Sequence, residues 1–86
     1  MYHVYIIRSV NNPKTHYTGF TRNFKNRLPA HNTSESSHTS KYRPWFLETI
    51  NSFRDDQKAK EFELYLKSHS GRAFSTKHFQ AHPSIG

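Results

Sequence analysis

The alternation of apolar and polar positions in this chain predicts three short strands. Residues 2–8, YHVYIIR, are rich in β-branched and aromatic side chains, and apolar residues occur in both alternating sets. We therefore expect this strand to be buried on both faces. A polar turn centred on residues 11–13, NNP, separates it from a second strand at residues 16–20, which indicates an antiparallel hairpin. A third strand is expected over residues 45–53, WFLETINSF.

The first helical pattern follows the second strand directly. Thr21 can serve as the N-cap of a helix that begins near Arg22, because Phe24 and Leu28 are four residues apart and form an apolar stripe. Pro29 has no amide proton, and its ring clashes with the carbonyl one turn earlier. We therefore expect this helix either to end before Pro29 or to kink there.

The stronger helical pattern covers residues 57–68. Asp55 and Asp56 offer an N-cap and acidic groups in the first turn. The apolar stripe of this helix consists of Ala59, Phe62 and Leu66. Residues 70–71, Ser-Gly, should stop it, and residues 72–79 should form a further short helix.

These elements predict an α+β fold, a small three-stranded antiparallel sheet flanked by helices. With 86 residues the chain is expected to form one domain at residues 1–79, followed by a flexible tail at 80–86. Residues 32–40, NTSESSHTS, are expected to be a polar loop.

The charge balance favours a polyanionic partner. Thirteen Lys and Arg face six acids, which gives a net charge of +7 and favours nucleic acid over a membrane. No apolar run approaches the roughly 20 residues of a membrane span, and no signal peptide pattern is present. We therefore expect a cytoplasmic protein that does not contact membranes. The absence of cysteine excludes a disulfide framework and a thiolate metal site.

Two other classes of site receive little support. His78 and His82 have the four-residue spacing of metal ligands on a helix, but the other histidines add no ligand pattern to them. A structural zinc site is therefore not expected. A nucleotidase is not supported either, because the chain has no glycine-rich loop that could cradle phosphates.

Residues 16–31, HYTGFTRNFKNRLPAH, gather side chains that suit a phosphate ligand. A glycine at position 19 interrupts the second strand and permits a bulge or a close approach of another group. Arg27 and His31 are four residues apart, so a continuing helix would place them on one face. Taken alone, Tyr17 could equally be a packed strand residue, and Arg27 and His31 could be solvated surface residues.

Two short motifs lie on the first two predicted strands, His3-Val4-Tyr5 and Tyr17-Thr18-Gly19. Arg27 follows Tyr17 by ten residues, and His31 comes one helical turn later. In this order and spacing the motifs resemble the GIY-YIG nuclease superfamily, and in particular its small single-domain bacterial members. His3-Val4-Tyr5 stands where the family has Gly-Ile-Tyr, Tyr17-Thr18-Gly19 stands where it has Tyr-Ile-Gly, and Arg27 and His31 match its helix motif.

The resemblance continues through the second half of the chain to residue 78. Residues 40–47, SKYRPWFL, resemble the approach to the third strand of the family, and residues 67–74, KSHSGRAF, resemble an ending of its small members. Residues 59–67, AKEFELYLK, resemble its metal-binding helix, with Glu63 at the acidic position. Without the resemblance, Glu63 would be taken as an exposed acid that pairs with a lysine on its own helix.

The resemblance implies a DNA endonuclease, a phosphodiesterase of low sequence specificity that nicks one strand with one Mg²⁺ or Mn²⁺. Glu63 would hold the cation, and Arg27 would clamp the scissile phosphate. Tyr5 or Tyr17 would orient or deprotonate the attacking water, with Arg27 and the metal lowering the tyrosine pKa. His31 would accept a proton through a tyrosine or contact phosphate. We expect these five side chains to line one basic cleft.

Several positions depart from the family pattern. His3 replaces a glycine, Phe20 stands where some relatives have lysine or tyrosine, Pro29 precedes His31, and Ser75 stands where larger relatives have asparagine. These departures keep open a basic nucleic-acid-binding module that has the nuclease fold but little or no turnover. A structural or partner-binding domain with incidental charge is less favoured, because the tyrosine, arginine and glutamate of the motifs are intact.

Overall fold

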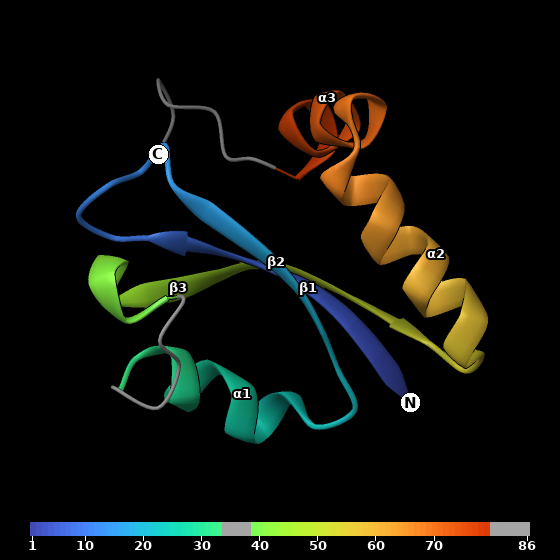
Figure 1. Cartoon of the computed structure of the whole chain (residues 1–86), viewed down its shortest axis with the longest axis horizontal. Helices are drawn as coiled ribbons and strands as arrows, with labels where there is room; N and C mark the ends of the chain where they lie inside the picture. Colours follow the sequence, from blue (N-terminus) through green and yellow to red (C-terminus); the bar gives the residue numbers. More distant parts are fainter. Residues whose placement is uncertain (34–38, 80–86) are drawn as a thin grey trace.

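The structure, a computed structural model, describes residues 1–33 and 39–79. Three antiparallel strands form one sheet in the order β2-β1-β3 (Figure 1). These strands are β1 (Tyr2–Ser9), β2 (His16–Thr21) and β3 (Trp45–Phe53). The three strands and the hairpin expected from the sequence are confirmed, and β2 and β3 are the two edges of the sheet.

Helices cover both faces of this sheet (Figure 1). Helix α1 (Phe24–His31) packs on one face, and α2 (Asp56–Lys67) and α3 (His69–His78) lie on the other. A short 3₁₀ helix, η1 (Ser40–Tyr42), precedes β3. The α+β class is therefore confirmed.

The central strand β1 supplies both hydrophobic cores. Val4 and Ile6 pack toward α2 and α3, and Tyr5 and Ile7 pack toward α1. At most 1% of each of these four residues is exposed, because successive side chains of a strand point to opposite faces. The strand is thus buried on both faces, as its composition predicts.

Helix α1 differs from the expectation at its start, and at its end it follows one of the two expected courses. Its N-cap is Asn23 rather than Thr21, whose hydroxyl instead accepts a hydrogen bond from the Asn23 amide at 3.1 Å. The helix does not end before Pro29 but continues to His31. The next residue, Asn32, holds this end in place, because its side chain accepts from the Trp45 amide at 2.5 Å and donates to the Trp45 carbonyl at 3.1 Å. This attachment to β3 outweighs the one helical hydrogen bond that proline removes.

Helices α2 and α3 follow each other without a linker. Asp55 caps α2 as predicted, by accepting from the Lys58 amide at 2.9 Å. The predicted stop at residues 70–71 is wrong, because α2 already ends at Lys67 and α3 begins at His69. Ser68 between them donates its hydroxyl to the Tyr65 carbonyl at 2.5 Å and accepts from the Gly71 amide at 3.1 Å.

Gly71 is buried in the first turn of α3 and serves a different purpose from a helix stop. A Cβ atom at this position would lie 1.6 Å from the carbonyl oxygen of Tyr65. The glycine therefore allows the two helices to approach each other closely at their junction.

Parts of two expectations lie outside the described residues. The predicted tail, 80–86, does so entirely, and the predicted polar loop does so for residues 34–38. Thr39, also expected in that loop, is 1% exposed. Within the described part of the chain, no helix has the length and apolar character needed to cross a membrane.

Candidate active site

The predicted site residues come from both faces of the sheet. Tyr5, Tyr17 and His31 belong to the core under α1, whereas Glu63 lies on α2, on the other face. The expected single cleft is not formed by the hollows at these residues, because Tyr17 and Arg27 border separate ones. The two sides come together around β2, which is an edge of the sheet. Consistent with this, the negative charge of Glu63 helps to raise the pKa of Tyr5.

A chain of three hydrogen-bonded side chains forms the interior of the site. The Tyr5 hydroxyl is 2.8 Å from Nε2 of His31, and Nδ1 of His31 is 2.7 Å from the Thr39 hydroxyl. At most 2% of each residue is exposed. Burial, and then the charge of Arg27, lower the pKa of His31 below its ordinary value of 6.5. The imidazole is therefore neutral at neutral pH, with one ring nitrogen donating and the other accepting.

This chain can move a proton inward. In the tautomer that donates from Nδ1 to Thr39, Nε2 accepts the hydroxyl proton of Tyr5. Tyr5 is thus hydrogen-bonded to a base that is fixed in position by a second partner. The part played by Thr39 was not found from the sequence, where it stands in a run of small polar residues without any motif.

The pKa of Tyr5 is raised, whereas the sequence suggested that neighbouring cations would lower it. Burial and the neighbouring Tyr17 raise it well above the ordinary value of 10.0, and Glu63 adds to this, whereas Arg27 lowers it. The effect of Arg27 has the expected sign but is smaller than the cost of placing a phenolate in the core. Tyr5 is therefore a neutral phenol at working pH, and it can take up a proton only while it passes its own to His31.

Gly19 makes the position of the Tyr5 hydroxyl possible. The two residues are paired across the β1–β2 ladder, whose register is regular at this point. A Cβ atom on Gly19 would lie 2.3 Å from the Tyr5 hydroxyl oxygen and 2.4 Å from its Cζ. Of the two expected uses of this glycine, the close approach is the one observed, and it lets the phenol lie over the edge strand.

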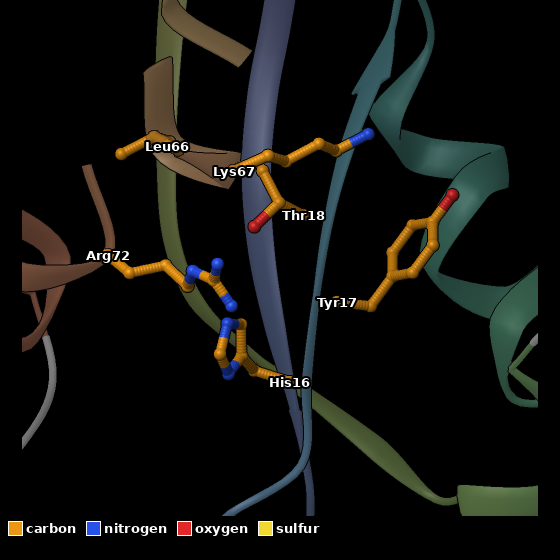
Figure 2. A pocket seen from close by; sticks show the side chains of 6 residues that line it. All are labelled: His16, Tyr17, Thr18, Leu66, Lys67 and Arg72. Carbon is orange, nitrogen blue, oxygen red and sulfur yellow. The ribbon is translucent and has the colours of Figure 1, made fainter. Parts of the chain in front are cut away.

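Tyr17 differs from Tyr5 in exposure. Its ring packs against His31, with ring centroids 5.1 Å apart, and against Tyr5 at 6.4 Å. Tyr17 is nevertheless half-buried and also borders a hollow on the edge of β2 (Figure 2). Tyr17 is therefore the tyrosine that a ligand in solution can contact, and Tyr5 is the one connected to the imidazole.

Arg27 stands at the surface of α1. It borders a second hollow, between α1 and the end of β2, and its charge lowers the pKa of both Tyr5 and His31. Within residues 1–33 and 39–79 it forms no ion pair. A cation that is close to the phenol and the imidazole, and that is not neutralised by a carboxylate, is suited to an anionic ligand.

Glu63 is the acid best placed to hold a cation. Its side chain is 20% exposed and accepts a hydrogen bond from the Lys67 ammonium at 3.0 Å, so a positive charge already occupies this position. Glu61 on the same helix is 54% exposed and pairs with Lys58 instead. No group of three or more potential metal ligands occurs in the described part of the chain. A cation at Glu63 would take its other ligands from water and phosphate, which suits Mg²⁺.

The departures from the family pattern leave the site open. The His3 side chain turns toward β3, where its Nδ1 is 2.7 Å from the Ser52 hydroxyl. Phe20 packs in the core on the other face, stacked on Tyr2 with ring centroids 6.1 Å apart. Pro29 does not prevent His31 from reaching Tyr5.

Comparison with known proteins identifies the family of the chain. The family model of the GIY-YIG catalytic domain matches residues 1–78. No curated protein matches the chain. The matched region contains every element from β1 to α3 and all five of the predicted site residues. The chain therefore belongs to the GIY-YIG family and forms a nuclease-type domain.

Proposed function

We propose that this protein is a metal-dependent endonuclease that nicks DNA with little sequence specificity. The observation that carries the proposal is the buried chain from Tyr5 through His31 to Thr39, with Arg27 close to it. A buried phenol needs a hydrogen-bond partner in any case, but here the partner is a neutral imidazole that can itself take up a proton and whose second nitrogen is held by Thr39. This arrangement provides a positioned proton acceptor beside a cation for phosphate.

The proposed reaction is hydrolysis of a phosphodiester. As the oxygen of the attacking water bonds to phosphorus, the water proton passes to the Tyr5 oxygen, and the hydroxyl proton of Tyr5 passes to Nε2 of His31. Because Tyr5 is 1% exposed, this step requires the half-buried Tyr17 ring to turn aside when the ligand binds. The bond from phosphorus to the 3′ oxygen then breaks, the released 3′ oxygen takes a proton from solvent, and His31 returns to its neutral form by giving up the proton it gained. Tyr5 is neutral before and after this transfer, so its raised pKa is compatible with the step.

The remaining side chains act on the phosphate. Arg27 would bind the nonbridging oxygens from the α1 side of β2, and Tyr17 would orient the ligand at the edge of the strand. Glu63 would hold Mg²⁺ or Mn²⁺ on the α2 side, displacing the Lys67 ammonium. When bound, such a cation supplies Lewis-acid stabilisation of charge on the phosphate and on the leaving oxygen. A single site of this kind cuts one strand.

Affinity for DNA should come mainly from phosphate contacts. The net charge is +7, and phosphate contacts carry little sequence information. The binding constant on duplex DNA should therefore fall with salt with a log–log slope of about −0.9 for each phosphate neutralised. A binding constant that does not change with salt would contradict this part of the proposal.

One observation favours the second candidate, a binding module with little turnover. Glu63 is already paired with Lys67, and Tyr5 lies in surroundings that oppose its ionisation. If the metal cannot displace Lys67, the protein would bind DNA without cleaving it.

The test is a nicking assay with Mg²⁺ or Mn²⁺ on duplex, branched and single-stranded DNA. Glu63→Gln keeps the size of the side chain and removes its charge, so it should fold and lose cleavage. Its metal-free binding should hold or tighten, because a negative charge near the phosphates is gone. Glu61→Gln is the matched control, with the same change on an exposed acid of the same helix, and it should cleave normally.

The outcomes separate the two candidates. Cleavage that survives in Glu63→Gln refutes the assignment of the metal to this residue. No cleavage by the unmodified protein on any of the substrates, together with salt-sensitive binding, would leave the binding module as the function.

A further inference from the structure

A hollow of about 210 Å³ lies against β2 on the side of α2 and α3. It is lined by His16, Tyr17, Thr18, Leu66, Lys67 and Arg72 (Figure 2). Figure 2 shows the long side chains of Lys67 and Arg72 extending from the two helices toward the strand, with the His16 ring next to the Arg72 guanidinium. The mechanism proposed above uses none of these three groups to bind phosphate.

The lining of the hollow is positively charged and contains no carboxylate. Lys67 is neutralised in part by Glu63, but the guanidinium of Arg72 makes no ion pair with any residue in 1–33 or 39–79. Burial and the charges of Arg8 and Arg72 lower the pKa of His16, and Glu48 raises it. Cations gathered in this way repel one another, so an anion that enters the hollow relieves that repulsion.

The fold holds Arg72 in a defined place. It directly follows Gly71, whose lack of a side chain allows α3 to approach α2, and its amide donates to the Ser68 carbonyl at 2.9 Å. The hydroxyl of Thr18, which is 7% exposed, adds a neutral hydrogen-bonding group from β2. The hollow therefore presents two cations and a hydroxyl from three rigid elements, which is a suitable lining for a phosphate group.

We propose that Lys67, Arg72 and Thr18 form a second phosphate-binding site for the same nucleic-acid strand that Arg27 binds. This inference rests on the proposed function, because it requires a nucleic-acid ligand. Tyr17 lies between the two sites, since its ring packs against His31 on the α1 side, whereas its neighbours His16 and Thr18 face the hollow (Figure 2). The strand would thus cross the free edge of β2 at Tyr17, with one phosphate at Arg27 and a neighbouring phosphate in the hollow.

The two cations of the hollow differ in what they contribute. The charge of Lys67 is partly used by Glu63 at 3.0 Å when no metal is bound, whereas the charge of Arg72 is fully available. In the absence of metal, Arg72 therefore contributes more to binding than Lys67. When a cation replaces Lys67 at Glu63, the ammonium is freed for the hollow.

The experiment measures binding of DNA in the absence of metal, so that no cleavage takes place. A short fluorescein-labelled DNA duplex is titrated with protein in EDTA, and anisotropy is followed over a range of salt concentrations. Arg72→Gln should weaken binding about tenfold, the value for losing one charge-assisted hydrogen bond to phosphate. It should also reduce the steepness of the log–log salt dependence by about 0.9. Lys77→Gln, the same loss of charge at an exposed position of α3 outside the hollow, is the control and should leave both quantities nearly unchanged.

Two further variants sharpen the result. Arg72→Lys keeps the charge and should recover most of the salt dependence, although it loses the planar fork that pairs with two phosphate oxygens. Lys67→Gln combined with Glu63→Gln, which leaves no unpaired carboxylate, should weaken metal-free binding less than Arg72→Gln. Thermal unfolding of every variant checks that the fold is intact, as expected for exposed positions.

Equal losses in Arg72→Gln and Lys77→Gln would overturn the second site, because they would show only a general effect of charge. An unchanged salt dependence in Arg72→Gln would do the same. If the unmodified protein nicks DNA and Arg72→Gln binds normally, only the second site is refuted. If the unmodified protein never nicks DNA but Arg72→Gln weakens binding as expected, only the nuclease proposal is refuted. Absence of any binding by the unmodified protein would overturn both.

Discussion

The two faces of the sheet are built on the same strand but use it differently. On the side of α2 and α3, Val4 and Ile6 pack against Ala59, Leu66 and several phenylalanines, and the core is purely apolar at its centre. On the side of α1, the buried residues of the core are Tyr5, Ile7 and Trp45. The phenol of Tyr5 and the indole of Trp45 both make buried hydrogen bonds, to His31 and to the Thr39 carbonyl.

This difference between the two faces indicates on which face the same residues contribute both to the proposed reaction and to the stability of the fold. Under α1, the groups proposed to move a proton are themselves part of the core, so most changes there should affect cleavage and folding together. Under α2 and α3, the charged groups stand at the rim and the core only supports them. Changes on that side should therefore affect either stability or ligand binding, but not both.

Gly19→Ala should give the largest effect, on the α1 side. The added methyl group would meet the hydroxyl and Cζ of Tyr5 at 2.3–2.4 Å and force the phenol away from His31. Nicking should fall by about 10²–10⁴, the usual contribution of a positioned acid or base. Stability should fall by about 1–3 kcal/mol through overpacking. The measurements are nicking rate and urea unfolding, and normal nicking by this variant would separate Tyr5 from the reaction.

Arg27→Ala tests an exposed residue on the same side. Losing one fixed charge at the phosphate should lower the nicking rate by about 10²–10³. The free energy of unfolding should change by at most about 0.5 kcal/mol, because Arg27 is at the surface of α1. Lys25→Ala, on the same helix and also exposed, is the control for the change of charge. A large loss of stability in Arg27→Ala would show that the arginine is a structural residue.

Leu66→Ala tests the centre of the apolar core on the other side. Leu66 is 2% exposed, and its truncation should lower the free energy of unfolding by about 2–5 kcal/mol. The nicking rate per folded molecule, measured at a temperature at which the variant is still folded, should be close to that of the unmodified protein. A rate that drops along with stability would mean that the two faces are not separate in function.

The smallest expected effect is the change of stability and nicking rate with pH that is due to His31. His31 has a lowered pKa in the folded protein, so its neutral form adds stability that is fully present above the unfolded pKa of about 6.5 and is lost as the pH falls below it. Nicking should fall only as the pH drops through the lowered pKa of His31 in the folded protein, because protonated Nε2 cannot accept from Tyr5. The unfolding midpoint of His31→Gln should therefore change less between neutral pH and pH of about 5 than that of the unmodified protein. Equal changes in the two proteins would show that His31 does not titrate in this way.

Much of the fold could be predicted because local patterns and tertiary contacts agree. The apolar residues in both alternating sets of residues 2–8 are typical of a strand buried on both faces, and Asp55 is an ordinary N-cap, as the structure confirms. The sequence-based predictions failed or stayed undecided where a contact between residues far apart in the chain determines the local structure. Asn32 holds α1 to β3 beyond Pro29, and Gly71 serves a helix approach rather than a helix end.

The motifs of the site could be predicted, but their chemical environment could not. The sequence places Tyr5 and His31 in motifs of the family, yet it does not show that the two residues touch or that Thr39 completes the chain. For Tyr5, burial, which depends on the whole fold, outweighs the charge of Arg27, so the pKa of this tyrosine is raised although Arg27 acts in the expected direction. Whether Tyr5, Tyr17, Arg27, His31 and Glu63 act together in catalysis stays a prediction.

The junction at Ser68 has a consequence for how the chain tolerates added length. Because one residue ends α2 and begins α3, there is no spare segment in which an inserted residue could be absorbed. One extra residue at the start of α3 would rotate everything after it by about 100° about the helix axis, and Arg72 would turn away from β2. In a library of single-residue insertions, this junction should be among the least tolerant positions. The exposed turn at residues 11–14 should accept insertions readily.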